Sequence, residues 1–270
     1  MLPRSSGRPS VALLAAVCAA LTLAPSAPPA AQLPRGSLRV LVPAYFYPLA
    51  SSPWSRLNAA AAAHPQRVAA IGNPGSGPGS AFDSSYSAAF AGFRASGGLL
   101  LGYVHSSYGA RPAAAVKADM TQWRAWYPLD GFFIDEMDNL AGAHEAYYRD
   151  LFLHARSLVP RGIVVGNPGV STPQSYLFWN NQRVVSALCI QESSSSFLAW
   201  QSDSWVKALP RRNFYALPYA VGASTWPSVV DHAYAENCGW IYTTDDVLPN
   251  PWDTLPSYFE ALVSYVDASY

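Results

Sequence analysis

Three acidic residues directly follow two apolar segments of the chain. Asp135 and Glu136 come after residues 131–134, and Glu192 comes after residues 187–191. An apolar segment that ends in an acid is typical of a buried strand that holds a carboxyl group beside hydrophobic walls, which can raise its pKa. Glycoside hydrolysis uses two such groups, which lie about 5–5.5 Å apart in retaining enzymes. The same acids could instead lie in surface turns or cap the next helices.

The alternation of side chains along a strand distinguishes Asp135 from Glu136, and Glu192 from Cys189. Successive side chains of a strand point to opposite faces, so Glu136 has the opposite phase to Asp135, and we expect it to support the site or bind substrate unless the strand end twists. By the same rule, Cys189 should point away from Glu192, towards the helix layer. Cys189 and Cys238 could pair in an oxidising compartment, but two buried free thiols are our expectation.

Further polar and aromatic residues follow other apolar segments and are candidates for binding substrate. Those we select are Tyr45, Tyr47, Asn73, His105, Tyr108, Asn167, Tyr219 and Asp245. Aromatic faces stack against sugar rings, which suits the tyrosines, whereas a structural role for His105 stays open. The chain has no Gly-x-Ser-x-Gly, His-x-x-x-His or Cys-x-x-Cys motif, so we expect no metal and no cofactor.

The elements that must position these residues alternate along the chain. The strand-like segments are 38–47, 67–72, 98–104, 131–135, 162–165, 187–191, 213–218 and 239–243. Helix-like segments lie between them, and residues 142–158 show the clearest spacing. Apolar strands buried on both faces indicate a parallel sheet, and eight such units predict an α/β fold that closes into a single (β/α)8 TIM-type barrel.

An open, doubly wound sheet is the alternative fold. Such a sheet would usually carry a glycine-rich phosphate loop, and residues 75–79 lack both the dinucleotide fingerprint and a phosphate-binding lysine. We interpret that segment as a turn. In a closed barrel, the active site lies where the strands run into the loops that follow them, which is where the candidate residues stand.

Composition limits the partners and the number of domains. The 270 residues are 50% hydrophobic, which favours one domain, and the formal net charge of 0 favours neither nucleic acid nor an anionic membrane as partner. We expect a monomer. Arg4 and Arg8 precede an apolar run at 11–23 and small residues at 24–31, so residues 1–31 are predicted to be a secretory signal peptide. Residues 32–270 would form the secreted domain. A retained N-terminal anchor is the alternative.

Five segments of the chain resemble the spherulin-4 family. They are VPAYFYP at 42–48, NPGSGPG at 73–79, GYVHSSYG at 102–109, DGFFIDE at 130–136 and GNPG at 166–169. The resemblance implies a (β/α)8 barrel and, from fungal members, a glycoside hydrolase that acts on galactosaminogalactan. By similarity to related α-galactosaminidase barrels, Asp135 would be the nucleophile and Glu192 the acid/base. Glu136 matches the second acid of the family's Asp-Glu pair.

The resulting expectation is a secreted, endo-acting glycoside hydrolase that cleaves a polysaccharide containing N-acetylgalactosamine or galactosamine, with retention of configuration. The alternative is a secreted surface or coat protein that binds polysaccharide through the same cleft without cutting it. A polysaccharide deacetylase would need metal ligands that this sequence does not assemble. Matrix remodelling and sporulation are both open as biological settings.

Overall fold

The computed structural model describes residues 37–193 and 196–270 of the chain. The predicted signal peptide at 1–31 lies outside the described residues, so its assignment stays a prediction. In the described ranges, no helix has the length and apolar character needed to cross a membrane.

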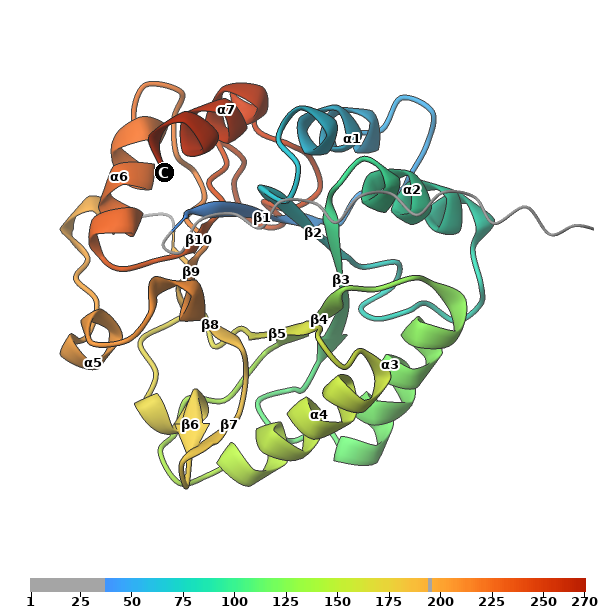
Figure 1. Cartoon of the computed structure of the whole chain (residues 1–270), viewed down its shortest axis with the longest axis vertical. Coiled ribbons are helices and arrows are strands. Elements are labelled where there is room, and N and C mark those ends of the chain that lie inside the picture. Colours follow the sequence, from blue (N-terminus) through green and yellow to red (C-terminus); the bar gives the residue numbers. More distant parts are fainter. Residues whose placement is uncertain (1–36, 194–195) are drawn as a thin grey trace, which may run out of the picture.

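Eight parallel strands close into a barrel (Figure 1). Around the barrel they are hydrogen-bonded in the order β1-β10-β9-β8-β5-β4-β3-β2. Their bounds are β1 Arg39–Ala44, β2 Val68–Gly72, β3 Leu99–His105, β4 Gly131–Asp135, β5 Ile163–Gly166, β8 Ala187–Gln191, β9 Phe214–Ala216 and β10 Trp240–Ile241. The barrel expected from the sequence is confirmed, and the open sheet is excluded.

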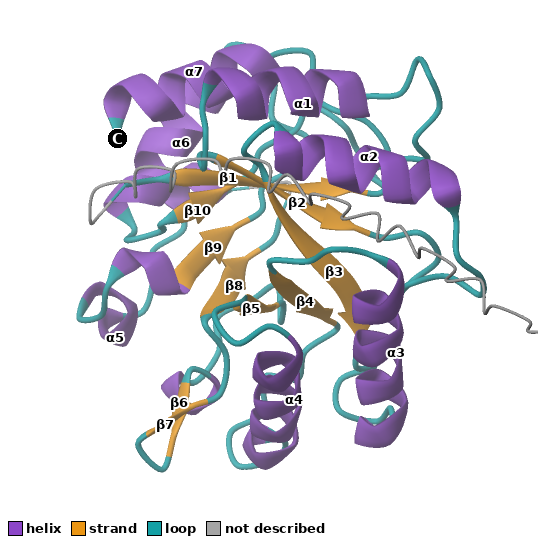
Figure 2. Ribbon diagram, turned by 45° about the vertical axis from the view of Figure 1, so that its right-hand side comes forward, coloured by secondary structure: helices purple, strands orange, loops and turns teal. Residues whose placement is uncertain are grey.

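Six longer helices pack around the outside of the barrel (Figure 2). They are α1 Trp54–Ala63, α2 Ser84–Ala95, α3 Ala113–Trp126, α4 Glu145–Leu158, α6 Trp226–Ala235 and α7 Phe259–Ser269. Helix α4 corresponds to the helix expected at 142–158, and Tyr148, Leu151 and Ala155 form part of its buried face. This spacing places one apolar stripe of the helix against the sheet.

One quarter of the barrel departs from the expected alternation of strands and helices. Between β5 and β8 the chain forms a short 3-10 turn, η1 Gln174–Tyr176, and an antiparallel hairpin of β6 Phe178–Trp179 and β7 Gln182–Arg183. Between β8 and β9 lie η2 Phe197–Ala199, the four-residue helix α5 Ser204–Lys207 and η3 Arg211–Asn213. This side of the barrel therefore has a thinner outer layer, as Figure 1 shows around β6, β7 and α5.

Glycines in two strands let aromatic rings of the helices lie directly on the sheet. A Cβ atom at Gly72 would come within 2.7 Å of the Phe90 ring, and one at Gly102 within 2.9 Å of the Trp123 ring. Trp123 then donates a hydrogen bond from Nε1 to the carbonyl oxygen of Tyr103 at 2.7 Å. This hydrogen bond links α3 to Tyr103 of β3, whose side chain reaches the candidate site.

Strand register brings the candidate residues to one level of the barrel. His105, the last residue of β3, pairs with Asp135, the last residue of β4. In β8 the pairing with β9 is interrupted by a register shift between Cys189 and Gln191. Such a bulge changes the face to which later side chains of a strand point, which affects Glu192.

Candidate active site

Asn167 joins the two principal acids at the carboxyl end of the barrel. Its Nδ2 atom donates to Oδ1 of Asp135 at 2.8 Å and to Oε2 of Glu192 at 2.9 Å. The two carboxyl oxygens are therefore separated by no more than the sum of these distances. This limit applies to one oxygen of each group, and it is compatible with the about 5–5.5 Å between the carboxyl groups of retaining glycosidases.

The surroundings of these acids affect their protonation. Burial raises the pKa of Glu192 to about 7, the charge of Asp135 adds to the rise, and the hydrogen bond from Asn167 opposes it. Burial also raises the pKa of Asp135, but hydrogen bonds from Tyr103 and Asn167 favour its charged form. Asp135 thus has a raised pKa but two donors to its charged form, and it lies beside a Glu192 that exchanges a proton near neutral pH.

Tyr103 holds the second oxygen of Asp135. Its hydroxyl donates to Oδ2 at 2.8 Å, so each oxygen of this carboxylate accepts one side-chain hydrogen bond. The Tyr103 ring also packs edge-on against Tyr45, with centroids 5.6 Å apart. Tyr45, one of the predicted site residues, therefore lies next to the residue that fixes Asp135.

Glu136 occupies a left-handed backbone conformation, with φ of 50°. Two hydrogen bonds to its carbonyl oxygen hold this conformation, from the Tyr108 amide and the Ser106 hydroxyl, both at 2.7 Å. Non-glycine residues seldom adopt such angles. The strand thus turns at its end, and Glu136 and Asp135 line the same pocket, which the simple alternation of strand phase did not predict.

His105 lies next to Glu136 at the edge of the site. Its Nδ1 atom is 3.6 Å from Oε2 of Glu136 and 3.2 Å from Oγ of Ser107. The Glu136 side chain is 42% exposed, so it can reach a bound molecule at the mouth of the barrel.

A pocket of about 430 Å³ lies over these acids. Besides Asp135, Glu136 and Glu192, the walls include three of the predicted residues, which are Tyr108, Asn167 and Tyr219. The other lining residues are Pro168, Gly169, Val170, Leu248, Pro249, Pro251 and Trp252. The pocket combines clustered acids with aromatic and apolar walls, the composition expected of a cleft for sugars.

Asn167 keeps one polar atom free at the centre of the site. Its Oδ1 atom is buried and has no hydrogen-bond partner within the described residues. Gly169 has φ of 70°, a left-handed conformation that favours glycine, and its carbonyl accepts from the Glu192 amide at 2.8 Å. The loop 167–169 therefore positions Glu192.

Three other predicted residues make contacts within loops and do not line the pocket. The Tyr47 hydroxyl donates to Asp83, the residue that caps the start of α2. Oδ1 of Asn73 accepts from the amide of Gly77 at 3.1 Å, which closes a turn. The carboxylate of Asp245 accepts from the amide of Ser257 at 3.2 Å.

Two residues of the site escaped the sequence analysis. Tyr103 is in phase with His105, two residues further on, and that spacing was the available signal for it. Trp252 lies in the long segment after β10, where no strand end marks it, and its ring packs edge-on against Tyr219 at 5.9 Å between centroids.

Cys189 and Cys238 are buried and free, as expected. Burial raises the pKa of the Cys189 thiol, and the charge of Glu192 adds to the rise. The orientation of Cys189 towards the helix layer stays a prediction, and the bulge after Cys189 interrupts the alternation on which it was based.

No group of three or more His, Cys, Asp or Glu residues in the described part of the chain is arranged to hold a metal ion. The acids of the site are instead satisfied by side-chain donors, mainly Tyr103 and Asn167.

Fold and site together define a parallel barrel with a pocket of paired carboxyl groups at the carboxyl ends of its strands, the position that active sites occupy in barrels of this kind. The chain belongs to the spherulation-specific family 4, whose model matches residues 39–266. Spherulin-4 of Physarum polycephalum is 32% identical over 244 residues, covering 86% of this chain and 70% of that protein. The resemblance noted in the sequence is confirmed.

A solved structure has the same architecture. Aspergillus clavatus Sph3, determined in complex with GalNAc, aligns with a TM-score of 0.74 at 23% identity. The alignment covers 86% of this chain and 98% of that one. This likeness shows the fold.

Proposed function

We propose that this protein is a secreted glycoside hydrolase, acting as a monomer, that cuts internal bonds of a polysaccharide containing N-acetylgalactosamine or galactosamine. The observation that carries the proposal is the double hydrogen bond from Asn167, which holds Asp135 and Glu192 close together in one pocket. The GalNAc complex of Sph3, which has the same fold, supports the choice of sugar.

Asp135 is the nucleophile in this proposal. Tyr103 and Asn167 fix its two oxygens and favour its ionised form, which is the form that attacks the anomeric carbon. The attack forms an ester between Asp135 and the sugar and breaks the bond to the leaving oxygen. Water then cleaves that ester, so two inversions give net retention of configuration.

Glu192 is the acid and base. With a pKa of about 7, it holds a proton for part of the population at neutral pH and can give it to the leaving oxygen. In the second step the resulting carboxylate takes a proton from the attacking water. The pKa of an acid/base catalyst is best placed near the working pH, which burial achieves here.

Glu136 and the pocket walls bind the substrate. The exposed carboxylate of Glu136 and the ring of Tyr108 lie at the mouth of the site, and Trp252 and Tyr219 form a further aromatic wall.

The test is to incubate the secreted protein with purified galactosaminogalactan and, separately, with chitin. We expect soluble oligosaccharides from the first polymer by mass spectrometry, and NMR should show that the first-formed reducing ends keep the configuration of the cleaved bond. A variant carrying both Asp135→Asn and Glu192→Gln is the control. Polymer that binds but is never cut would support the alternative of a binding protein and contradict the proposal.

A further inference from the structure

A second and larger pocket lies at the opposite end of the barrel. Its volume is about 730 Å³, and six of its 14 lining residues begin barrel strands or immediately precede them. Arg39 begins β1, Ile163 begins β5 and Ser186 precedes β8. The pocket is therefore separated from the carboxyl groups of the candidate active site by the length of the barrel strands.

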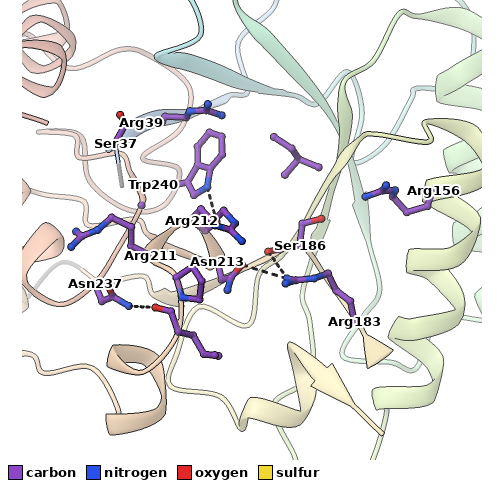
Figure 3. Close-up of a pocket in the computed structure, with 14 residues that line it drawn as sticks. Ser37, Arg39, Arg156, Arg183, Ser186, Arg211, Arg212, Asn213, Asn237 and Trp240 are labelled. Carbon is purple, nitrogen blue, oxygen red and sulfur yellow. Dashed lines mark hydrogen bonds between the residues drawn. The ribbon is translucent and has the colours of Figure 1, made fainter. Parts of the chain in front are cut away.

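Arginine is the residue type that distinguishes this pocket. Five arginines are among its lining residues, and none of the lining residues is Asp or Glu. In Figure 3 the side chains of Arg39, Arg156, Arg183 and Arg212 surround the space, whereas Arg211 points away from it. The guanidinium of Arg211 instead stacks on the Tyr234 ring at 3.6 Å and donates to the Tyr234 carbonyl.

Arginines elsewhere in the described chain commonly have carboxylate partners. The ion pairs are Arg56 with Glu260, Arg67 with Asp267, Arg94 with Asp130 and Arg111 with Asp119. No such pair involves an arginine of the second pocket within residues 37–193 and 196–270. Their positive charges are therefore not neutralised by this part of the protein.

Uncharged groups hold the arginine side chains of this pocket in position. The guanidinium of Arg183 donates to the carbonyls of Val185 and Ser186 and lies over the Phe178 ring at 4.4 Å. That of Arg39 lies over the Trp240 ring at 5.2 Å. Carbonyls and rings fix the orientation of a guanidinium but leave its unit charge in place.

Several donors remain without partners. The guanidinium groups of Arg39 and Arg212 make no hydrogen bond within the described part of the chain, and Arg183 uses only Nη1. Each guanidinium has five N–H donors in a planar fork that fits the oxygens of phosphate or sulfate.

The positive charges of the pocket arginines also repel one another. Burial lowers the pKa of Arg183, and the positive charge of Arg212 lowers it further. Because a guanidinium does not lose its proton at ordinary pH, deprotonation cannot relieve this unfavourable proximity, whereas an anion between the two groups would.

We propose that this pocket binds a compact polyanion that carries phosphate or sulfate groups. Guanidinium groups approach the space from β1, α4, β7 and η3, and tetrahedral oxyanions, with oxygens directed to several sides, match this arrangement better than a planar carboxylate does. A volume of about 730 Å³ is in the range of small-molecule pockets and accommodates more than one such group. The site is independent of the function proposed for the carboxyl end.

Calorimetric titration of the secreted protein with inorganic pyrophosphate at low salt tests this site. We expect binding that weakens as salt is added, since ion pairing is screened. Arg212→Gln should weaken it about tenfold or more, because a charged donor is lost. Arg212 is exposed and its side chain makes no hydrogen bond in the described chain, so the variant should fold normally. Arg124→Gln, on the exposed side of α3, is the matched control and should bind as the unaltered protein does.

Parallel titrations separate the possible sources of the oxyanion. Dextran sulfate presents sulfates on a polymer, and citrate presents carboxylates of similar total charge. We expect pyrophosphate to bind more tightly than citrate, with Arg212→Gln weakening both pyrophosphate and any dextran sulfate binding. Absence of pyrophosphate binding at low salt, or equal loss with Arg124→Gln, would overturn the proposal.

Discussion

The two ends of the barrel carry buried or half-buried groups of opposite charge. The neighbouring residues that contact these groups differ between the two ends. At the carboxyl end, Asp135 and Glu192 accept hydrogen bonds from neutral donors, and burial moves the pKa of Glu192 to about 7. At the amino end, Arg39, Arg183 and other arginines are oriented by carbonyls and aromatic rings, with no carboxylate among the residues lining the pocket.

The difference follows from what each group can do when it is buried. A carboxyl group can take up a proton, so burial turns Glu192 into a group that exchanges protons near neutral pH. A guanidinium keeps its proton, so a cluster of them stays positive and attracts anions. One end of the fold is therefore suited to proton transfer and the other to binding charge.

The largest expected effect is loss of the charged group at the carboxyl end. Asp135→Asn preserves the shape of the side chain but removes the charge that attacks the anomeric carbon, so turnover of the polymer should fall by about 10³-fold or more while polymer binding remains. Initial rates and an affinity measurement on the same preparation would separate the two effects. Near-normal turnover, combined with an inactive Glu136→Gln variant, would assign the nucleophile to Glu136.

Glu192→Gln tests whether Glu192 transfers protons at the carboxyl end of the barrel. Loss of the general acid should be severe on the polymer and much milder on an aryl glycoside with a good leaving group, provided that the pocket accepts one. In the unaltered protein, the rate of leaving-group protonation should decline as pH rises through about 7, since Glu192 then loses its proton. Equal losses on both substrates would contradict this role.

The same variant should change stability in a definite direction. The folded state raises the pKa of Glu192 above 4.5, so it binds the proton more tightly than the unfolded chain does. Stability contributed by the protonated form is therefore lost as pH rises from about 4.5 to about 7. Above that range, Glu192→Gln should be more stable than the unaltered protein by up to about 3 kcal/mol, measured by urea unfolding at pH 5 and pH 8.

The principal acids were predictable because each follows a mainly apolar segment. Residues 131–135 and 187–191 show this pattern in the sequence itself, and both form strands of the barrel. Eight such segments also predicted closure, since parallel strands alternating with helices have few other solutions.

The remaining features depended on local backbone geometry. The left-handed turn at Glu136 is held by contacts from Tyr108 and Ser106, which belong to another strand end, and the bulge in β8 depends on its pairing with β9. Neither leaves a periodic pattern in the sequence. The arginine pocket was equally hidden, because its members are spread from residue 39 to residue 212 in a chain with net charge 0.

Tyr103→Phe tests a positioning residue with a smaller expected effect. The hydrogen bond from Tyr103 lowers the pKa of Asp135, so its loss should raise that pKa and move the acidic limit of activity to higher pH. Turnover should fall about 10-fold with little change in substrate binding. Tyr86→Phe is the control, because Tyr86 lies on α2 outside the pocket and its hydroxyl makes no hydrogen bond within the described residues. An unchanged pH profile in Tyr103→Phe would contradict the positioning role.

The smallest expected effect concerns the amino end in the absence of an anion. Replacing Arg212 with glutamine removes the charge that lowers the pKa of Arg183, so the folded protein loses a repulsion and should become slightly more stable at low salt. Because Arg212 is exposed, the gain should be below about 0.5 kcal/mol, and it should vanish near 1 M salt, where the screening length is about 3 Å. Thermal unfolding at several chloride concentrations, with Arg124→Gln as control, would measure it. A loss of stability in Arg212→Gln at low salt would mean that its charge has an anionic partner within the protein, and the contrast between the two ends of the barrel would then fail.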